Sequence, residues 1–447
     1  MVSMRACGGT VQQVHSQDSA WSWFVCLSAT FADGLSLSLS NCFAIMLPVL
    51  IQEFNETREN AAWVGSIAYS MSYFCAPLSA WCCVRFGCRR TAIVGTLTCA
   101  VSLIISSFAP GLLMMYFIYG ALFGIGGGFI HTSGLLTTTK YFYKRRSLAT
   151  GIVAAGASIG TLIGPVYQAL IDGVGWRNSY RIIGALFSIA CILVWVSYDP
   201  KVKDGQEDRT VSCEQGSQRR SGSCACPSLD CAVWRIPEYT VVLIAATVEA
   251  VGVYVPLAHL VKHCREIGVS AQKSSTLFIY IGITSFAGKL VSGRLCDSPR
   301  ISTLYVHQIS ALIIGASVLM IRLASDYTGF AIFAACYGCG NGMFITTMYL
   351  LFLNTVEPRL RPSALAYGEM VNAVSIAIGS PIAGLLADKM GSYIVSFYFS
   401  GGIVLFGASI PLLLCFRRKK NVVSDRELIE FKQGLKDADF IERETVL

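Results

Sequence analysis

The chain has 447 residues and a formal net charge of +8; 54% of its residues are hydrophobic and only 14% are Asp, Glu, Lys or Arg. Soluble domains carry roughly 25% charged residues, so this composition, with a mean hydropathy of +0.57, excludes a soluble protein. The basic residues sit in short loops between apolar blocks, which argues against nucleic acid as a partner.

Twelve apolar blocks follow one another along the chain. A helix needs about 20 apolar residues to cross the hydrocarbon core of a bilayer, and most of the blocks approach or exceed that length. The sequence therefore predicts an all-α membrane protein with twelve transmembrane helices. The blocks lie at 21–47, 61–84, 91–108, 112–138, 148–171, 182–196, 240–261, 275–296, 303–323, 329–353, 363–387 and 393–416.

One long polar segment divides six blocks from six. It is rich in charged residues, Ser, Gly and Cys, which is typical of a solvated linker. A pattern in the fifth block also recurs in the eleventh at a constant offset of 217 residues, which relates Gly151 to Gly368. Weak repeats of this kind are common in transporters, with the solute site between the repeats. We therefore predict two pseudo-symmetric six-helix bundles at 21–197 and 239–416, a cytoplasmic linker at 198–238, and tails at 1–20 and 417–447.

The loop charges predict the orientation of the chain. Lys and Arg concentrate in the even-numbered connections and after the last block, as in Arg89, Arg145 and Arg417. Loops rich in Lys and Arg remain on the cytoplasmic side of a membrane. We therefore expect both termini to be cytoplasmic.

Two short runs carry a family resemblance. Residues 141–149 read YFYKRRSLA, and residues 293–297 read GRLCD. Both resemble signatures of the monocarboxylate transporter family, a branch of the major facilitator superfamily, and the resemblance extends over all twelve blocks. It implies the twelve-helix carrier fold and a place in the plasma membrane. It also implies a role in conformational change for Arg145, Arg146, Gly151, Gly156, Arg294 and Asp297.

The chain also departs from the family pattern, which marks it as a divergent member. Proton-coupled members carry a lysine in the first helix, where this chain has Asn41. They also pair an Asp with an Arg in the eighth helix, where Ser285 and Lys289 stand here. Members without those groups are associated with facilitated movement of larger or zwitterionic solutes, such as aromatic amino acids, iodothyronines, creatine or carnitine.

Ionisable residues inside apolar blocks are candidates for a solute site, because a charge in hydrocarbon costs at least about 2.5–3.5 kcal/mol. Lys289 is the candidate for binding a carboxylate, although its stem could also extend to the headgroups. Asp33 and Glu249 could face the cavity, or be protonated carboxyls in helix packing. His131 is a weaker candidate. Asn41, Ser285 and Asn341 complete the predicted substrate site, while Glu369 and Asn372 could bind solute or a neighbouring helix.

The sequence predicts a secondary carrier that moves a small organic carboxylate or zwitterion by alternating access, and facilitated movement is favoured. Proton-coupled symport is the first alternative, with Asp33 or Glu249 replacing the missing acid. A non-transporting solute sensor is the second. We expect no catalytic residues, no cofactor and no metal site, because no nucleotide motif, nucleophile triad or metal-ligand spacing occurs.

Two further features point to modification and partners. Asn55 begins a glycosylation sequon on the predicted external side. The chain ends in Thr445, Val446 and Leu447, which fits a PDZ ligand. The family resemblance adds a single-span accessory glycoprotein to the expected partners, beside the lipid bilayer.

Overall fold

The computed structural model describes residues 17–56, 58–198, 229–269, 271–390 and 392–411. Within these ranges the chain is helical and forms no strand. The predicted PDZ ligand at 445–447 lies outside them. The first half of the chain contains α1 (Ala20–Asn41), α2 (Phe43–Phe54), α3 (Arg58–Phe74), α4 (Ala76–Phe86), α5 (Cys88–Ser106), α6 (Leu112–Met115), the π-helix η1 (Tyr116–Phe123), α7 (Gly124–Tyr141), α8 (Arg146–Leu162), α9 (Gly164–Val174) and α10 (Trp176–Ser197).

The second half begins earlier than expected. The short 3-10 helix η2 (Cys231–Arg235) lies inside the predicted linker, and Asp230 caps it by accepting a hydrogen bond from the Ala232 N–H. The other elements are α12 (Pro237–Val253), α13 (Val255–Glu266), α14 (Ala271–Cys296), α15 (Thr303–Leu319), η3 (Met320–Leu323), α16 (Tyr327–Asn354), η4 (Pro358–Leu360), α17 (Arg361–Met390) and α18 (Tyr393–Ser409).

These elements follow the predicted twelve-helix pattern, but several spans are broken. In the described part of the chain, nine helices are long and apolar enough to cross a membrane, and α3 with α4 forms a tenth span bent by 45°. The second, fifth and seventh spans break just before Pro77, Pro165 and Pro256. Proline lacks a backbone N–H and clashes with the preceding turn, so a helix stops and restarts there. Two shorter apolar stretches of helix are Ile45–Phe54, within α2, and Tyr393–Ser409, which is α18.

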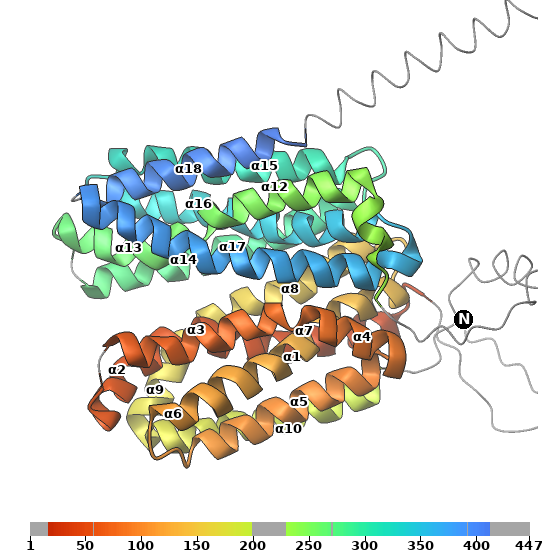
Figure 1. The fold of residues 1–447 in the computed structure, drawn as a ribbon, viewed down its shortest axis with the longest axis horizontal. Helices are drawn as coiled ribbons and strands as arrows, with labels where there is room; N and C mark the ends of the chain where they lie inside the picture. The colour runs from red at the N-terminus through yellow and green to blue at the C-terminus, as the bar shows by residue number, and fades with distance from the viewer. Residues whose placement is uncertain (1–16, 57, 199–228, 270, 391, 412–447) are drawn as a thin grey trace, which may run out of the picture.

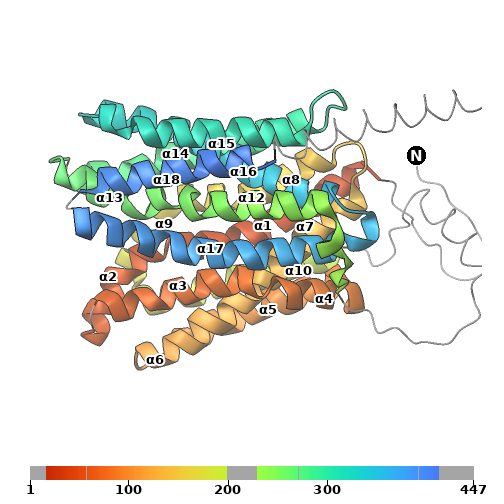
Figure 2. The ribbon, with the colours of Figure 1, turned by 45° about the horizontal axis from the view of Figure 1, so that its top comes forward.

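The helices form two groups that pack along their length (Figure 1). The first group, α1–α10, contacts the second, α12–α18, through α8 against α14 and α16 and through α3 and α4 against α17. Figure 2 shows α17 running beside α3. We call the end where α8 and α17 begin the basic end, because Lys140, Arg146 and Arg361 lie there; α2, α9 and α13 lie at the far end.

Two glycine contacts allow helices to approach closely. A Cβ on Gly156 of α8 would lie 2.6 Å from the Thr30 carbonyl oxygen of α1, so only glycine fits this crossing within the first half. A Cβ on Gly151 would lie 2.6 Å from the Lys289 carbonyl oxygen of α14. The second contact joins the two halves, so Gly151 sets how closely they approach.

Candidate functional site

A cavity of about 420 Å³ lies between the two halves. The first half contributes α1, α3, α7 and α8 to its wall, and the second half contributes α14, α16, α17 and the junction of α12 with α13. Cavities of roughly 300–1,000 Å³ accommodate small organic ligands. Its polar and aromatic lining includes Ser40, Asn41, Tyr69, Tyr73, His131, Ser158, Tyr254, Ser285, Lys289, Asn341 and Tyr349.

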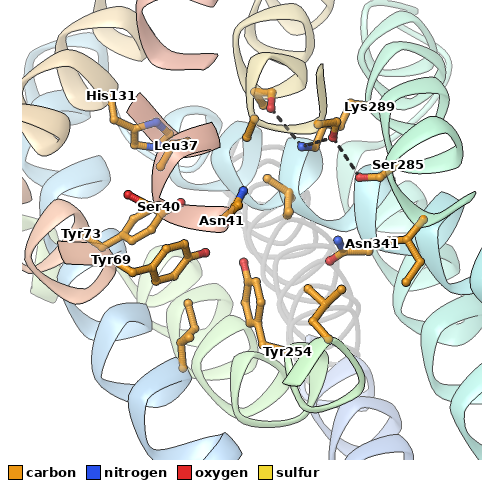
Figure 3. Close-up of a pocket in the computed structure, with 18 of the residues that line it drawn as sticks. Leu37, Ser40, Asn41, Tyr69, Tyr73, His131, Tyr254, Ser285, Lys289 and Asn341 are labelled. Atoms are coloured by element: carbon orange, nitrogen blue, oxygen red, sulfur yellow. Dashed lines mark hydrogen bonds between the residues drawn. The ribbon is translucent and has the colours of Figure 1, made fainter. Parts of the chain in front are cut away.

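Lys289 extends from α14 to α8 across the boundary between the halves (Figure 3). Its ammonium donates hydrogen bonds to the Ala154 carbonyl oxygen at 3.0 Å and to Ser158 Oγ at 2.8 Å. The side chain is 3% exposed, and none of the ion pairs among the described residues includes it. A buried ammonium with only neutral acceptors is incompletely stabilised, so Lys289 can accept a carboxylate as a further partner.

Tyrosines line the cavity opposite this charge. Tyr69 and Tyr73 of α3 lie across the cavity from Lys289 and Asn341, and Asn41 projects between them (Figure 3). The amide oxygen of Asn341 is buried without a hydrogen-bond partner among the described residues. Tyrosine offers both an apolar ring face and a polar hydroxyl, so this side of the cavity can contact a ring and a polar substituent together.

The predicted substrate residues Asn41, Ser285, His131 and Asn341 share this cavity with Lys289. The family comparison had indicated Asn41, Ser285 and Lys289. The sequence analysis did not identify the cavity tyrosines. A tyrosine in an apolar block carries a hydroxyl that needs a hydrogen-bond partner, and this need could have indicated a polar site.

Asp33 lies behind the cavity wall, in a buried cluster around His131. His131 Nδ1 lies 2.9 Å from Asp33 Oδ1 in the same half. On the other side of the ring, Nε2 lies 3.0 Å from the Tyr349 hydroxyl and 3.3 Å from Glu369 Oε1, both from the second half. Thr132 Oγ1 also donates to Glu369 Oε2 at 3.3 Å. The cluster therefore places one ring between two carboxylates from opposite halves.

Glu249 does not line the cavity, and its position agrees with the alternative of a carboxyl buried in helix packing. Its carboxylate lies 3.0 Å from His307 Nε2, and His307 Nδ1 lies 2.9 Å from Thr347 Oγ1. Glu249 packs against Gly407 of α18, where an added Cβ would lie 2.5 Å from Glu249 Cγ. The side chain therefore points into the interior of the second half. The sequence places Glu249 on a helix but does not show which neighbours its side chain faces.

The predicted conformational residues gather at the basic end. The Asp297 carboxylate accepts the backbone N–H groups of Ser147 at 2.9 Å and Leu148 at 3.3 Å, so it caps α8 from the other half. Burial raises the pKa of Asp297, while these hydrogen bonds and Arg294 oppose the shift. Arg146 donates to the Asn354 amide oxygen at 2.5 Å. These bonds join the halves at the basic end.

The other predicted residues do not line the cavity. The Arg145 backbone N–H donates to Asp18 Oδ1 at 3.3 Å, and Arg294 is exposed at the end of α14. Gly151 and Gly156 lie at the helix crossings described above. Asn55 is exposed at the far end, where it ends α2 in a left-handed conformation.

Comparisons with known proteins agree with this architecture. Residues 26–367 and 242–444 match the Major Facilitator Superfamily. The chain is 31% identical to monocarboxylate transporter 10 of Mus musculus, over 87% of this chain and 78% of that protein. It is 26% identical to monocarboxylate transporter 4 of Mus musculus, over 94% of this chain and 90% of that protein.

A solved structure shares the fold. The proton:xylose symporter XylE, bound to 6-bromo-6-deoxy-D-glucose, superposes with a TM-score of 0.69 at 14% identity, over 88% of this chain and 95% of that chain. These matches confirm the predicted twelve-helix fold and the predicted family. The chain is thus a membrane transporter rather than an enzyme, and it belongs, as a divergent member, to the monocarboxylate transporter family of the major facilitator superfamily.

Proposed function

We propose that this protein is an alternating-access carrier for an organic carboxylate with an aromatic or similarly flat body. In this proposal Lys289 binds the carboxylate, and Tyr69, Tyr73 and Tyr254 contact the rest of the solute. The halves then rock around the site between them. We also propose that the protein lies in the plasma membrane with its basic end in the cytoplasm. Because the halves are joined at the basic end, the cavity of this conformation would then take up solute from the external side.

The buried cation is the observation that carries the proposal. A charge in a low-dielectric site attracts an opposite charge strongly, and Lys289 has no carboxylate partner among the described residues. The volume of about 420 Å³ supports a solute larger than a three-carbon acid. Aromatic amino acids and iodothyronines combine a carboxylate with a ring, so they are the classes that this lining favours.

An uptake panel in expressing cells tests the proposal. Aromatic amino acids, iodothyronines, creatine, carnitine and lactate are offered at equal concentration. We expect saturable uptake of a ring-bearing carboxylate and much slower uptake of lactate, because lactate leaves the tyrosine side of the cavity unfilled. Amine analogues that lack the carboxylate serve as controls. Equal uptake of the acid and its amine analogue would contradict a site built on Lys289.

Proton-coupled transport is the second candidate, and the His131 cluster favours it. If Asp33 and Glu369 are ionised and His131 and Lys289 are protonated, the four buried charges cancel. A solute carboxylate then adds one negative charge, which a proton on the cluster would neutralise. The cluster thus supplies ionisable groups that the family's lysine and aspartate positions no longer hold.

Glu369→Gln distinguishes coupled from facilitated movement. Uptake is compared at external pH values of about 6 and about 7.5, which change the external proton concentration roughly thirtyfold. A coupled carrier gives higher uptake at the lower pH, and Glu369→Gln removes this difference. Glu249→Gln is the matched control, because Glu249 also pairs with a buried histidine but lies away from the cavity. If wild-type uptake is the same at both pH values, movement is facilitated and the coupled candidate is rejected.

A further inference from the structure

A second pocket, of about 340 Å³, lies at the basic end between the two halves. The first half contributes Lys140 of α7, Arg146 of α8 and the loop residue Tyr143 to its wall, and the second half contributes Arg361 of α17. No residue of the central cavity lines this pocket. It is therefore separate from the proposed solute site.

The lining of this pocket is strongly positive. It contains Lys140, Arg146 and Arg361, and no Asp or Glu lines it. Two carboxylates lie beside it, but both bind backbone groups. Asp18 accepts the N–H groups of residues 143–145, and Asp297 accepts those of residues 147 and 148, each with both of its oxygen atoms. These acids therefore cap the ends of the loop before α8.

We infer that this pocket binds a phosphate-bearing anion. Guanidinium groups bind phosphate through paired charge-assisted hydrogen bonds, and a lysine adds a point charge. Thr139 and Gln17 supply further polar groups in the same wall. The ligand is either the headgroup of an anionic phospholipid or a free phosphate compound, because the pocket lies where the spans end and the basic loop before α8 begins.

An anion in this pocket would connect the two halves. Lys140 and Arg146 belong to the first half and Arg361 to the second, so the ligand stabilises the arrangement in which the basic end is closed. Binding of the anion does not depend on the proposed carrier function. Its effect on the change between the two carrier conformations does depend on it. The bound anion should therefore slow the step in which the halves separate at the basic end and the cavity opens there.

Thermal unfolding of the purified full-length protein tests the inference. The lipid probe is phosphatidylinositol bisphosphate in phosphatidylcholine nanodiscs, and the free probe is tripolyphosphate added to nanodiscs without that lipid. Wild-type protein should unfold at a higher temperature with at least one probe. Lys140→Gln should weaken the apparent affinity roughly tenfold, because it removes one charge-assisted contact. Lys144→Gln is the control, since this exposed lysine is in the adjacent loop but does not line the pocket.

The outcomes separate the sources and the failure cases. A response to the lipid alone assigns a headgroup, and a response to tripolyphosphate assigns a free phosphate compound. If neither probe shifts unfolding, the inference is wrong. If Lys140→Gln and Lys144→Gln weaken the response equally, the effect is general surface attraction and the pocket is not the site. Because the readout is unfolding, either result is independent of whether the chosen solute is transported.

Discussion

Replacement of Lys289 by Gln should nearly abolish transport of the carboxylate solute. The substituted side chain keeps hydrogen-bonding capacity toward Ser158 but removes the buried positive charge. Loss of one member of a buried, hydrogen-bonded charge pair weakens binding by about 2–5 kcal/mol, so uptake at low solute concentration should fall at least roughly thirtyfold. Initial uptake rates, normalised to the amount of protein at the cell surface, measure this loss.

Ser285→Ala is the matched control for Lys289→Gln. Ser285 lines the same cavity, and its hydroxyl lies 3.3 Å from Ser158 Oγ, which contacts Lys289. The substitution removes a neutral hydrogen bond, worth about 0.5–1.5 kcal/mol, so the loss should be about two- to twelvefold. If Lys289→Gln takes up every carboxylate of the panel at the wild-type rate, Lys289 is not the anion site.

Gly151→Ala should have the second-largest effect, through the approach of the two halves. The added Cβ would lie 2.6 Å from the Lys289 carbonyl oxygen, and a contact shorter than 3.0 Å with backbone requires α8 and α14 to separate. Overpacking of this kind costs about 1–3 kcal/mol. The equilibrium ratio of the conformation closed at the basic end to the one open there should therefore fall by roughly five- to 150-fold. The rate of transport should fall as well.

Spin labels carried by unnatural amino acids at Lys144 and Arg300 can report this separation. Both positions are exposed and lie at the basic end in opposite halves. We expect a longer label distance in Gly151→Ala than in the wild type. Gly173→Ala is the control, because nothing lies within 4 Å of an added Cβ at that helical position. An unchanged label distance with normal transport would show that the crossing tolerates a methyl group.

The sequence predicted the architecture well because its strongest signal is the length and number of apolar blocks. It did not predict the breaks in the second, fifth and seventh spans, although the prolines that follow them are visible in the sequence. No polar residues mark the break in a block that is apolar throughout, so composition alone predicts one continuous helix where the structure has two. The missing information is local backbone chemistry, which Pro77, Pro165 and Pro256 supply.

The family comparison fixed part of the candidate site, and the polar chemistry of His131 and Asn341 in apolar blocks indicated two more of its residues. Lys289, Ser285 and Asn41 were identified by the family comparison, and all three line the cavity. The partners of His131 were not predictable, because Tyr349 and Glu369 lie 218 and 238 residues away in the sequence and meet it only when the halves pack. The sequence could not decide between the two alternatives for Glu249, because the direction of a side chain on a helix depends on its neighbours in space.

Two of the buried histidines, His131 and His307, differ in whether their contacts cross the boundary between the halves. His307 links α15 to Glu249 of α12 within one half, so this pair can persist while the halves rock. His131 contacts Tyr349 and Glu369 across the boundary, so rocking that separates these helices breaks those contacts and re-forms them once per turnover. In the proposed cycle, a tighter His131 cluster would raise the free energy needed to separate the halves and so slow turnover, whereas a tighter His307–Glu249 pair would not.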